Sequence, residues 1–316
     1  MYQNRLSYQG DLTPVLEKAC IAYQVGDLIN FHLIETGYED FNIKIETTNG
    51  KYLAKIFAKF RNQAEIQRLT SILAKISEQN ISSPKLHLTS NGIIFQDNQL
   101  SMVFMDYIEG KTFYDLNTTP SDDDLSKIIE QAAQINQIQF ADLSYLSDSW
   151  SVQNINNTYK QTNEFIKDKL ALDFIQNSID KWNKIPMEKL PISFVHGDII
   201  TTNVIKSNDN KLFIIDFSVA NLYPRIQEIA VITSNLIANN GKTLIENANT
   251  VMNIYNKFNP LTDTEQKHFI SYVMAETSAI YMGALREKIL NGNNSIETTY
   301  WLDLCYQDMK SYQEHT

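Results

Sequence analysis

The sequence predicts an α+β fold in two lobes: a small N-terminal lobe with an antiparallel sheet and a helix, and a larger, mainly helical C-terminal lobe. Three observations support this prediction. The chain has 316 residues, which favours two lobes over one. Alternating apolar side chains typical of strands fill much of residues 28–58. Apolar side chains at helical spacing recur in long segments after residue 121.

The composition excludes several classes of protein. Lys and Arg number 27 against 37 Asp and Glu, a formal charge of −10 without any block of Lys or Arg, so nucleic acid is not an expected partner. An acidic surface suits a cationic or amine-bearing substrate, although solubility explains it equally well. Cys20 and Cys305 are too few and too far apart to indicate a disulfide framework or a zinc site.

The sequence carries no recognisable targeting segment. Its first ten residues lack the apolar centre of a signal peptide, and no run approaches 18 apolar residues. We therefore expect a cytoplasmic protein with no membrane partner. Nothing in the sequence indicates an oligomeric state.

The N-terminal third predicts two helices and a set of strands. Apolar residues at helical spacing fill Thr13–Tyr23. Alternating runs on either side of Asn49-Gly50 predict a hairpin with a two-residue turn. A second helix is expected over Asn62–Glu78, before two further strands at residues 93–96 and 100–107.

The remainder of the chain predicts mainly helices. Ser121 is followed by three Asp residues, a helix-start signature in which the acids favour the helix dipole, so capping is expected there rather than metal binding. Helices are expected over four segments: Leu125–Phe140, much of Asn156–Trp182, Asp263–Leu290 and Ser295–Gln313. The aromatic side chains of the last segment are expected mainly to pack.

The stretch Phe194–Phe217 holds the polar residues with the clearest chemical use. Its pattern predicts a polar loop with Asp198 and Asn203, then a hairpin that ends at Asp216 and brings the three side chains together. Mg²⁺ takes oxygen ligands and often binds through one or two side chains plus substrate phosphates, so Asn203 and Asp216 are candidate metal ligands. Asp198, off the metal, is the candidate base for an attacking hydroxyl. Alternatively, Asp198 and Asp216 are merely turn and strand-end acids.

The motif HGDIITTNVI followed by IIDF resembles the catalytic core of the aminoglycoside phosphotransferase and homoserine/choline kinase-like superfamily, in which HGD-x4-N precedes IDF or IDW. The resemblance implies a two-lobed protein-kinase-like fold. It also implies an enzyme that uses ATP and Mg²⁺ to phosphorylate a hydroxyl of a small molecule. Residues 1–107 would then form the nucleotide-binding lobe, and residues 108–316 the catalytic and substrate-binding lobe. His196 is expected to hold backbone in place rather than to perform chemistry.

The same resemblance assigns nucleotide-binding residues. Lys55 lies inside an apolar strand, where an ammonium is costly unless it is paired. The resemblance implies that it contacts the α- and β-phosphates and that Glu65, on the following helix, holds it. Alternatively, Lys55 points outward from an edge strand and Glu65 is a solvated surface acid. In the segment VFMDYIEGKTF, Met105 would lie behind the adenine ring, while the Asp106 carbonyl and the Ile108 N–H would bind its edge.

The chain departs from the pattern of this superfamily at several positions. The segment Gly37–Asp40 is expected to be either the nucleotide flap turn or a hairpin turn without a ligand, because it has only one Gly. The Asp40 carboxylate would repel phosphate, so Asp40 is not expected to bind it. Ser218 stands where many relatives have Gly, and Glu228 stands in place of the Asp of an Asp-Leu-Ala segment. A longer carboxylate at Glu228 would have to brace the catalytic loop by hydrogen bonds.

Two functional hypotheses follow. The first is a small-molecule kinase whose acceptor is an aminoglycoside or other antibiotic, an amino alcohol or a homoserine-type compound. The second is a catalytically silent kinase-like protein that binds nucleotide or regulates a partner. The intact set of Lys55, Asp198, Asn203 and Asp216 favours the first. The C-terminal helices would wall the substrate site, and Glu276 and Arg286 are its most interesting polar residues.

Overall fold

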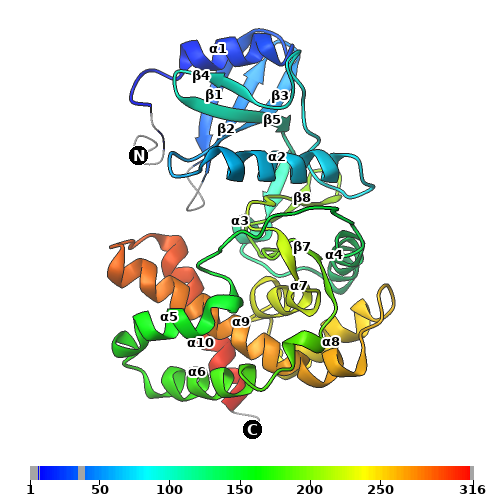
Figure 1. Cartoon of the computed structure of the whole chain (residues 1–316), viewed down its shortest axis with the longest axis vertical. Helices are drawn as coiled ribbons and strands as arrows, with labels where there is room; N and C mark the ends of the chain where they lie inside the picture. The colour runs from blue at the N-terminus through cyan, green and yellow to red at the C-terminus, as the bar shows by residue number, and fades with distance from the viewer. Residues whose placement is uncertain (1–5, 7, 35–39, 314–316) are drawn as a thin grey trace. The chain divides into compact units, whose positions relative to one another are not determined.

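The protein is described by a computed structural model that covers residues 6, 8–34 and 40–313. Its chain divides into two compact units, Met1–Gly110 and Lys111–Thr316. The first is built on an antiparallel sheet and the second is mainly helical, which confirms the predicted fold class (Figure 1). Within the described ranges, no helix is long and apolar enough to cross a membrane.

The N-terminal unit contains a five-stranded antiparallel sheet in the order β1-β2-β3-β5-β4. The strands are β1 (Leu28–Ile34), β2 (Phe41–Thr47), β3 (Gly50–Ile56), β4 (Phe95–Asp97) and β5 (Leu100–Asp106). Helix α1 (Thr13–Ala22) lies on one side of the sheet and α2 (Gln63–Ser77) on the other (Figure 1). Both helices fall close to their predicted positions.

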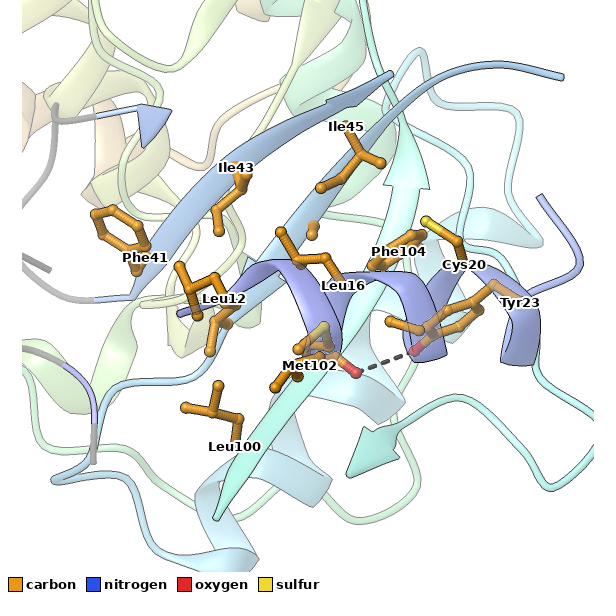
Figure 2. Close-up of a cluster of buried hydrophobic side chains, with 14 of the residues drawn as sticks. Leu12, Leu16, Cys20, Tyr23, Phe41, Ile43, Ile45, Leu100, Met102 and Phe104 are labelled. Atoms are coloured by element: carbon orange, nitrogen blue, oxygen red, sulfur yellow. Dashed lines mark hydrogen bonds between the residues drawn. The ribbon is translucent and has the colours of Figure 1, made fainter. Parts of the chain in front are cut away.

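Alternation along the strands gives the sheet two different faces. Figure 2 shows one face, where side chains from α1 pack against Ile43 of β2 and Phe104 of β5. The Tyr23 hydroxyl, next to the end of α1, donates to the Met102 carbonyl at 3.0 Å. Because neighbouring residues of a strand point to opposite faces, Lys55 and its cross-strand partner Val103 face away from this core.

The β2–β3 hairpin forms as predicted, but its turn lies one residue earlier than expected. Thr47 pairs with Gly50, so Thr48 and Asn49 form the two-residue loop. The Thr47 hydroxyl accepts from the Asn49 N–H at 3.2 Å and donates to the Val25 carbonyl at 2.5 Å. A threonine hydroxyl that bonds the backbone two residues on organises such a turn, which explains the shift.

The C-terminal unit is arranged around the 28-residue helix α9 (Asp263–Leu290), which contacts α5, α6, α7 and α10. The helices are α3 (Phe113–Leu116), α4 (Asp122–Ile135), α5 (Ile155–Thr162), α6 (Lys169–Trp182), α7 (Ile226–Val231), α8 (Leu244–Tyr255), α9 and α10 (Ile296–Gln313). Short helical turns cover Val152–Asn154, Asn163–Phe165, Met187–Lys189 and, in π form, Ile232–Leu236.

Two predicted helices end differently in the structure. The first, expected to run to Phe140, ends at Ile135. The segment Asn156–Trp182 forms two helices, because the Asp168 side chain accepts from the Ala171 N–H and so starts α6 afresh. The Ser121 hydroxyl accepts from the Asp124 N–H at 3.2 Å, which confirms capping at the start of α4.

The predicted hairpin in the stretch Phe194–Phe217 is present. Strands β8 (Val204–Ser207) and β9 (Leu212–Ile214) pair antiparallel, with β6 (Gly110–Thr112) beside β8. Strand β7 (Ile192–Val195) leads into the polar loop that carries Asp198 and Asn203, and it pairs with β10 (Asn221–Pro224). These two small sheets hold both ends of the polar loop.

Candidate active site

The amide of Asn203 is fixed by the catalytic loop itself. Its Nδ2 donates to the Asp198 carbonyl at 3.0 Å and to Asp198 Oδ2 at 2.6 Å. Both partner atoms are acceptors, so only the NH₂ end of the amide can face them. The amide oxygen, Oδ1, therefore points away from Asp198, and it is the atom that a hard cation would bind.

The hairpin brings Asp216 to the same place. The Ile215 N–H donates to the Asn203 carbonyl at 3.0 Å, so Asp216 follows directly after a residue bound to Asn203. Asp216 has a φ of 64°, in the left-handed region that residues other than glycine seldom adopt. Ser218 donates to Asp216 Oδ1 through its N–H, at 3.2 Å, and through its hydroxyl. The serine thus orients the carboxylate, a use that a glycine could match only in part.

His196 is structural, as predicted. Its side chain is fully buried, and the Asp198 N–H donates to its Nδ1 at 3.1 Å. Since Nδ1 accepts, the proton of the neutral ring lies on Nε2, which donates to the Ile215 carbonyl at 3.0 Å. The imidazole therefore ties the catalytic loop to the hairpin that carries Asp216.

Glu228, on α7, holds the backbone of the loop through two hydrogen bonds. Oε2 accepts from the His196 N–H at 2.6 Å, and Oε1 accepts from the Gly197 N–H at 3.3 Å. The carboxylate is completely buried. The expected hydrogen-bonding role of this position is therefore filled by a glutamate in place of the usual aspartate.

A buried polar network that the sequence did not reveal extends this brace. Asn136, at the end of α4, donates to the Phe194 carbonyl at 2.9 Å and to Glu228 Oε2 at 3.4 Å. Its Oδ1 accepts from the Tyr255 hydroxyl at 2.7 Å. The only signal in the sequence is a polar residue just after a helical apolar pattern, which also describes many exposed helix ends.

The buried position of Glu228 makes the stability of the protein depend on pH. Burial raises the pKa of Glu228 from an ordinary 4.5 to about 7, against the opposite effect of the His196 and Gly197 N–H groups. The folded protein thus binds the proton more tightly than the unfolded chain does. Tighter proton binding at Glu228 therefore stabilises the folded state below the unfolded pKa, and this stabilisation disappears as the pH rises through about 7. Each unit of difference between the folded and unfolded pKa is worth about 1.36 kcal/mol of stability.

We expect Glu228→Gln, which cannot titrate, to remove this dependence. The free energy of unfolding of the wild type, relative to Glu228→Gln, should fall by roughly 2–3 kcal/mol between pH 5 and pH 8. Urea unfolding of both proteins at several pH values measures this difference, and the subtraction cancels other titrating groups. Parallel stability curves for the two proteins would contradict the assignment.

In the N-terminal unit, the structure pairs Lys55 with an unexpected acid. Lys55 Nζ lies 3.8 Å from Asp40 Oδ2, and the two side chains are 5% and 2% exposed. Asp40 Oδ1 accepts from Arg61 Nε at 2.6 Å and from the Ala58 N–H at 3.0 Å. Lys55 is therefore a buried, paired ammonium rather than an outward-facing one. Of the expected flap turn, residues 37–39 lie outside the described residues.

The predicted pair between Lys55 and Glu65 is wrong. Glu65 occupies the third position of α2, where its carboxylate accepts from the Asn62 N–H at 3.0 Å while the Asn62 side chain accepts from the Glu65 N–H at 3.0 Å. This capping box satisfies two backbone groups at the helix start and holds the glutamate there. The sequence carries the signal for this role, since Asn62 and Glu65 have the spacing of a capping box.

The predicted adenine-binding residues lie at the end of β5 and just after it, and β5 pairs with the strand that carries Lys55. Met105 of β5 is buried and pairs with Leu53, so its side chain shares a face with Lys55. The Asp106 carboxylate contacts His87 Nε2 at 2.8 Å, and this hydrogen bond lowers the pKa of Asp106. Ile108 lies two residues beyond β5 and is partly buried.

A further acid in the C-terminal unit is buried with one oxygen that lacks a hydrogen-bond partner among the described residues. Glu276 of α9 is 2% exposed, and its Oε1 has no hydrogen-bond partner within the described part of the chain. Burial raises the pKa of Glu276 well above its usual range, and the carboxylates of Asp148, Asp198 and Glu228 raise it further. Glu276 would therefore be favoured in its charged form only if a cation were placed beside it.

The segment after Asp148 crosses the same face of α9. A Cβ at Gly283 would lie 2.5 Å from the Trp150 ring, so only glycine permits this approach. Arg286 Nη1 donates to the Ser149 carbonyl at 3.0 Å, which fastens the segment to the helix. The structure thus uses Arg286 to hold the segment in position.

Aromatic side chains complete the surroundings of the catalytic loop. Trp150 and Tyr300 pack against the same apolar cluster as Ile200, which follows Asp198 by two residues. The Tyr300 hydroxyl lies 3.3 Å from the Thr201 hydroxyl. Trp301, by contrast, is 3% exposed and belongs to the core, as predicted for the aromatic residues of the last helix.

The donor set fits a magnesium ion shared with a substrate. Among the described residues, no group of three or more His, Cys, Asp or Glu side chains could hold a metal ion by itself. One amide oxygen from Asn203 and one carboxylate from Asp216 are too few for an all-protein calcium or zinc site. They match the one or two protein ligands that Mg²⁺ takes when phosphates and water supply the rest.

The sheet-bearing unit, the loop with Asp198 and Asn203, and the hairpin that ends at Asp216 are the elements of a kinase-like fold. The model of the phosphotransferase enzyme family matches residues 30–250, more than half of the sequence. The chain belongs to this family, and the resemblance to aminoglycoside phosphotransferases and homoserine and choline kinases is confirmed.

Solved structures of similar fold include three small-molecule kinases. The microcompartment-associated aminopropanol kinase gives a TM-score of 0.70 at 12% identity, with 95% of this chain and 97% of that chain covered. Amicoumacin kinase, solved with AMP-PNP and Ca²⁺, gives 0.68 at 14% identity, covering 96% and 94%. Spectinomycin phosphotransferase, solved with ADP and spectinomycin, gives 0.66 at 15% identity, covering 96% and 100%.

One relative found by sequence is similar over a shorter region than the solved structures are. The homoserine kinase of Xanthobacter autotrophicus is 25% identical over 88 residues, which is 28% of this chain and 27% of that protein. This match thus spans about a quarter of the relative's length. The structural likenesses, all at low identity, define the fold and leave the acceptor open.

Proposed function

We propose that the protein transfers the γ-phosphoryl group of ATP, in the presence of Mg²⁺, to a hydroxyl group of a small amine-bearing molecule. The observation that carries this proposal is the mutual placement of Asp198, Asn203 and Asp216, fixed by His196 and Glu228. A catalytically silent relative has no need of an Asp, an Asn and a second Asp held in this arrangement.

The candidate site residues have distinct roles in the proposed reaction. Lys55 binds the α- and β-phosphates, and Met105, Asp106 and Ile108 bind the adenine. Asp198 accepts the proton of the acceptor hydroxyl while the hydroxyl oxygen forms a bond to the γ-phosphorus. The bond between that phosphorus and the β–γ bridging oxygen breaks, and ADP is released. General-base assistance of this kind contributes about 10²–10⁴-fold.

Mg²⁺, held through Asn203 Oδ1 and the Asp216 carboxylate, would neutralise charge on the phosphates. The hydrogen bonds that Asn203 donates to Asp198 serve two purposes in this arrangement. They aim the amide oxygen toward the ion, and they hold the Asp198 carboxylate for the acceptor. Positioning and charge neutralisation supply most of the rate in phosphoryl transfer, and both depend on these contacts.

The proposal that the acceptor carries an amine rests on Glu276. A buried carboxylate without a hydrogen-bond partner is costly, and a cation placed beside it would offset that cost. The Asp148 and Asp198 carboxylates both raise the pKa of Glu276, so an ammonium beside Glu276 would be attracted by all three acids. The three similar kinases named above carry aminopropanol, amicoumacin and spectinomycin in their names.

We expect Glu276→Gln to weaken binding of the amine acceptor while leaving use of ATP unchanged. Loss of one partner of a buried charge pair costs about 2 kcal/mol or more, a rise in KM of about 30-fold for the amine. Glu287→Gln, on the same helix, is the matched control. Steady-state kinetics with an amino alcohol and its uncharged analogue measure the effect; an equal loss for both compounds would argue against an ammonium site.

Release of ADP across a panel of hydroxyl compounds tests the proposed function itself. The panel should contain amino alcohols, aminoglycosides, homoserine and uncharged sugars or diols, each with MgATP. Stimulation of ADP release by amine-bearing compounds, with a new phosphomonoester signal in ³¹P NMR, is the expected result. A protein that binds MgATP but phosphorylates no compound would instead support the silent alternative.

A further inference from the structure

The N-terminal unit contains a buried carboxylate that no step of the proposed reaction uses. Asp40 lies immediately before β2, and its side chain is 2% exposed. The two cations beside it are buried as well, with exposed fractions of 5% for Lys55 and 4% for Arg61. Charges removed from water to this extent are tolerated when they are paired and hydrogen-bonded.

The two oxygens of Asp40 make different contacts. Oδ1 accepts from the Ala58 N–H at 3.0 Å and from Arg61 Nε at 2.6 Å. Oδ2 has no hydrogen-bond partner among the described residues and faces Lys55 Nζ at 3.8 Å. Because two donors hold Oδ1, the carboxylate cannot rotate freely, and Oδ2 remains directed at the ammonium.

The strand register explains why Asp40 reaches Lys55 so directly. Phe41 pairs with Ile56, and Asn42 pairs with Lys55, so Asp40 continues the pairing past the end of β3. There it is bound to the backbone of Ala58, three residues after Lys55. The lysine thus lies on β3 and the acid directly before the adjacent strand β2, without a helix between them.

We infer that Asp40 is the positioning residue of Lys55, in the role first expected of Glu65. Its carboxylate holds the ammonium in the orientation in which Lys55 binds the nucleotide phosphates, and Asp40 itself does not touch the nucleotide. This inference rests on the proposed function, since the binding of phosphate by Lys55 is part of that proposal.

Asp40→Asn tests the inference, because the amide oxygen can still accept from the Ala58 N–H while the negative charge is lost. Titration calorimetry with MgADP should give a dissociation constant about tenfold higher for Asp40→Asn than for the wild type, which is about 1.4 kcal/mol. Glu65→Gln is the matched comparison and should bind MgADP as the wild type does. A larger loss for Glu65→Gln than for Asp40→Asn would overturn the inference.

A double-mutant cycle separates positioning from general loosening of the unit. In a Lys55→Met background, Asp40→Asn should cause no further loss of MgADP affinity, because its effect passes through the missing ammonium. Additive losses would mean that Asp40 serves the fold alone. Should Asp40→Asn fail to fold, Asp40→Glu keeps the charge but displaces it, and it should give a smaller loss that again vanishes with Lys55→Met.

The result for the wild type distinguishes the two levels of the proposal. A wild-type protein that does not bind MgADP would overturn the proposed function and, with it, the role of Asp40. A wild-type protein that binds MgADP, combined with additive losses in the cycle, would overturn the role of Asp40 and leave the proposed function intact.

Discussion

Asp198→Asn is expected to lower kcat by about 10²–10⁴-fold while leaving the affinity for MgATP nearly unchanged. The amide cannot accept the proton of the acceptor hydroxyl, but it has nearly the same shape and can still accept the hydrogen bond from Asn203 Nδ2. Steady-state kinetics with the best acceptor of the panel, together with calorimetric titration of MgATP, measure both quantities.

The control for this variant is Asp209→Asn. Asp209 lies in the turn between β8 and β9 and pairs with Lys211 on the surface. Its replacement by Asn removes the same single negative charge as Asp198→Asn but leaves the loop with Asp198 unaltered. Its kinetic constants should match those of the wild type. Full turnover by Asp198→Asn would show that another group accepts the proton, or that none is needed.

Asp216→Asn is expected to weaken binding of nucleotide only when Mg²⁺ is present. Removal of the charged ligand should raise the dissociation constant of MgATP at least about tenfold, or about 1.4 kcal/mol, and little change is expected for ATP in EDTA. Asparagine is preferable to alanine here, because it tolerates the left-handed backbone at φ 64°. Calorimetric titrations with and without Mg²⁺ measure the difference.

The comparison of Mg²⁺ with EDTA also serves as the internal control. A general disturbance of the hairpin would weaken binding in both conditions. An unchanged affinity for MgATP in Asp216→Asn would remove Asp216 from the metal site, whatever happens to turnover.

The parts of the site that the sequence predicted are those in which local order decides the contacts. The turn after Ser207 and the two apolar runs on either side of it specify a hairpin, and the hairpin alone places Asp216 after the residue bound to Asn203. Helix α9 also follows its apolar periodicity, with limits as predicted. In both cases the determining residues are neighbours in the chain.

The parts that the sequence did not predict depend on contacts between distant residues or on the exact register of neighbouring strands. Asn136 meets Glu228 across 92 positions and Tyr255 across 119, and nothing in the local pattern of α4 marks it. The pairing of Asp40 with Lys55 follows from the β2–β3 register, whereas the sequence offered Glu65 as an acid on the next helix. Tertiary packing, rather than propensity, selects between such partners.

A crystal structure with AMP-PNP and Mg²⁺ is the most direct test of the account. We predict an ion about 2.0–2.1 Å from Asn203 Oδ1 and from a carboxylate oxygen of Asp216, with phosphate oxygens among its other ligands. Asp198 should lie off the ion, with its carboxylate facing the γ-phosphate. An ion held by Asp198, or one that neither Asn203 nor Asp216 contacts, would contradict the account.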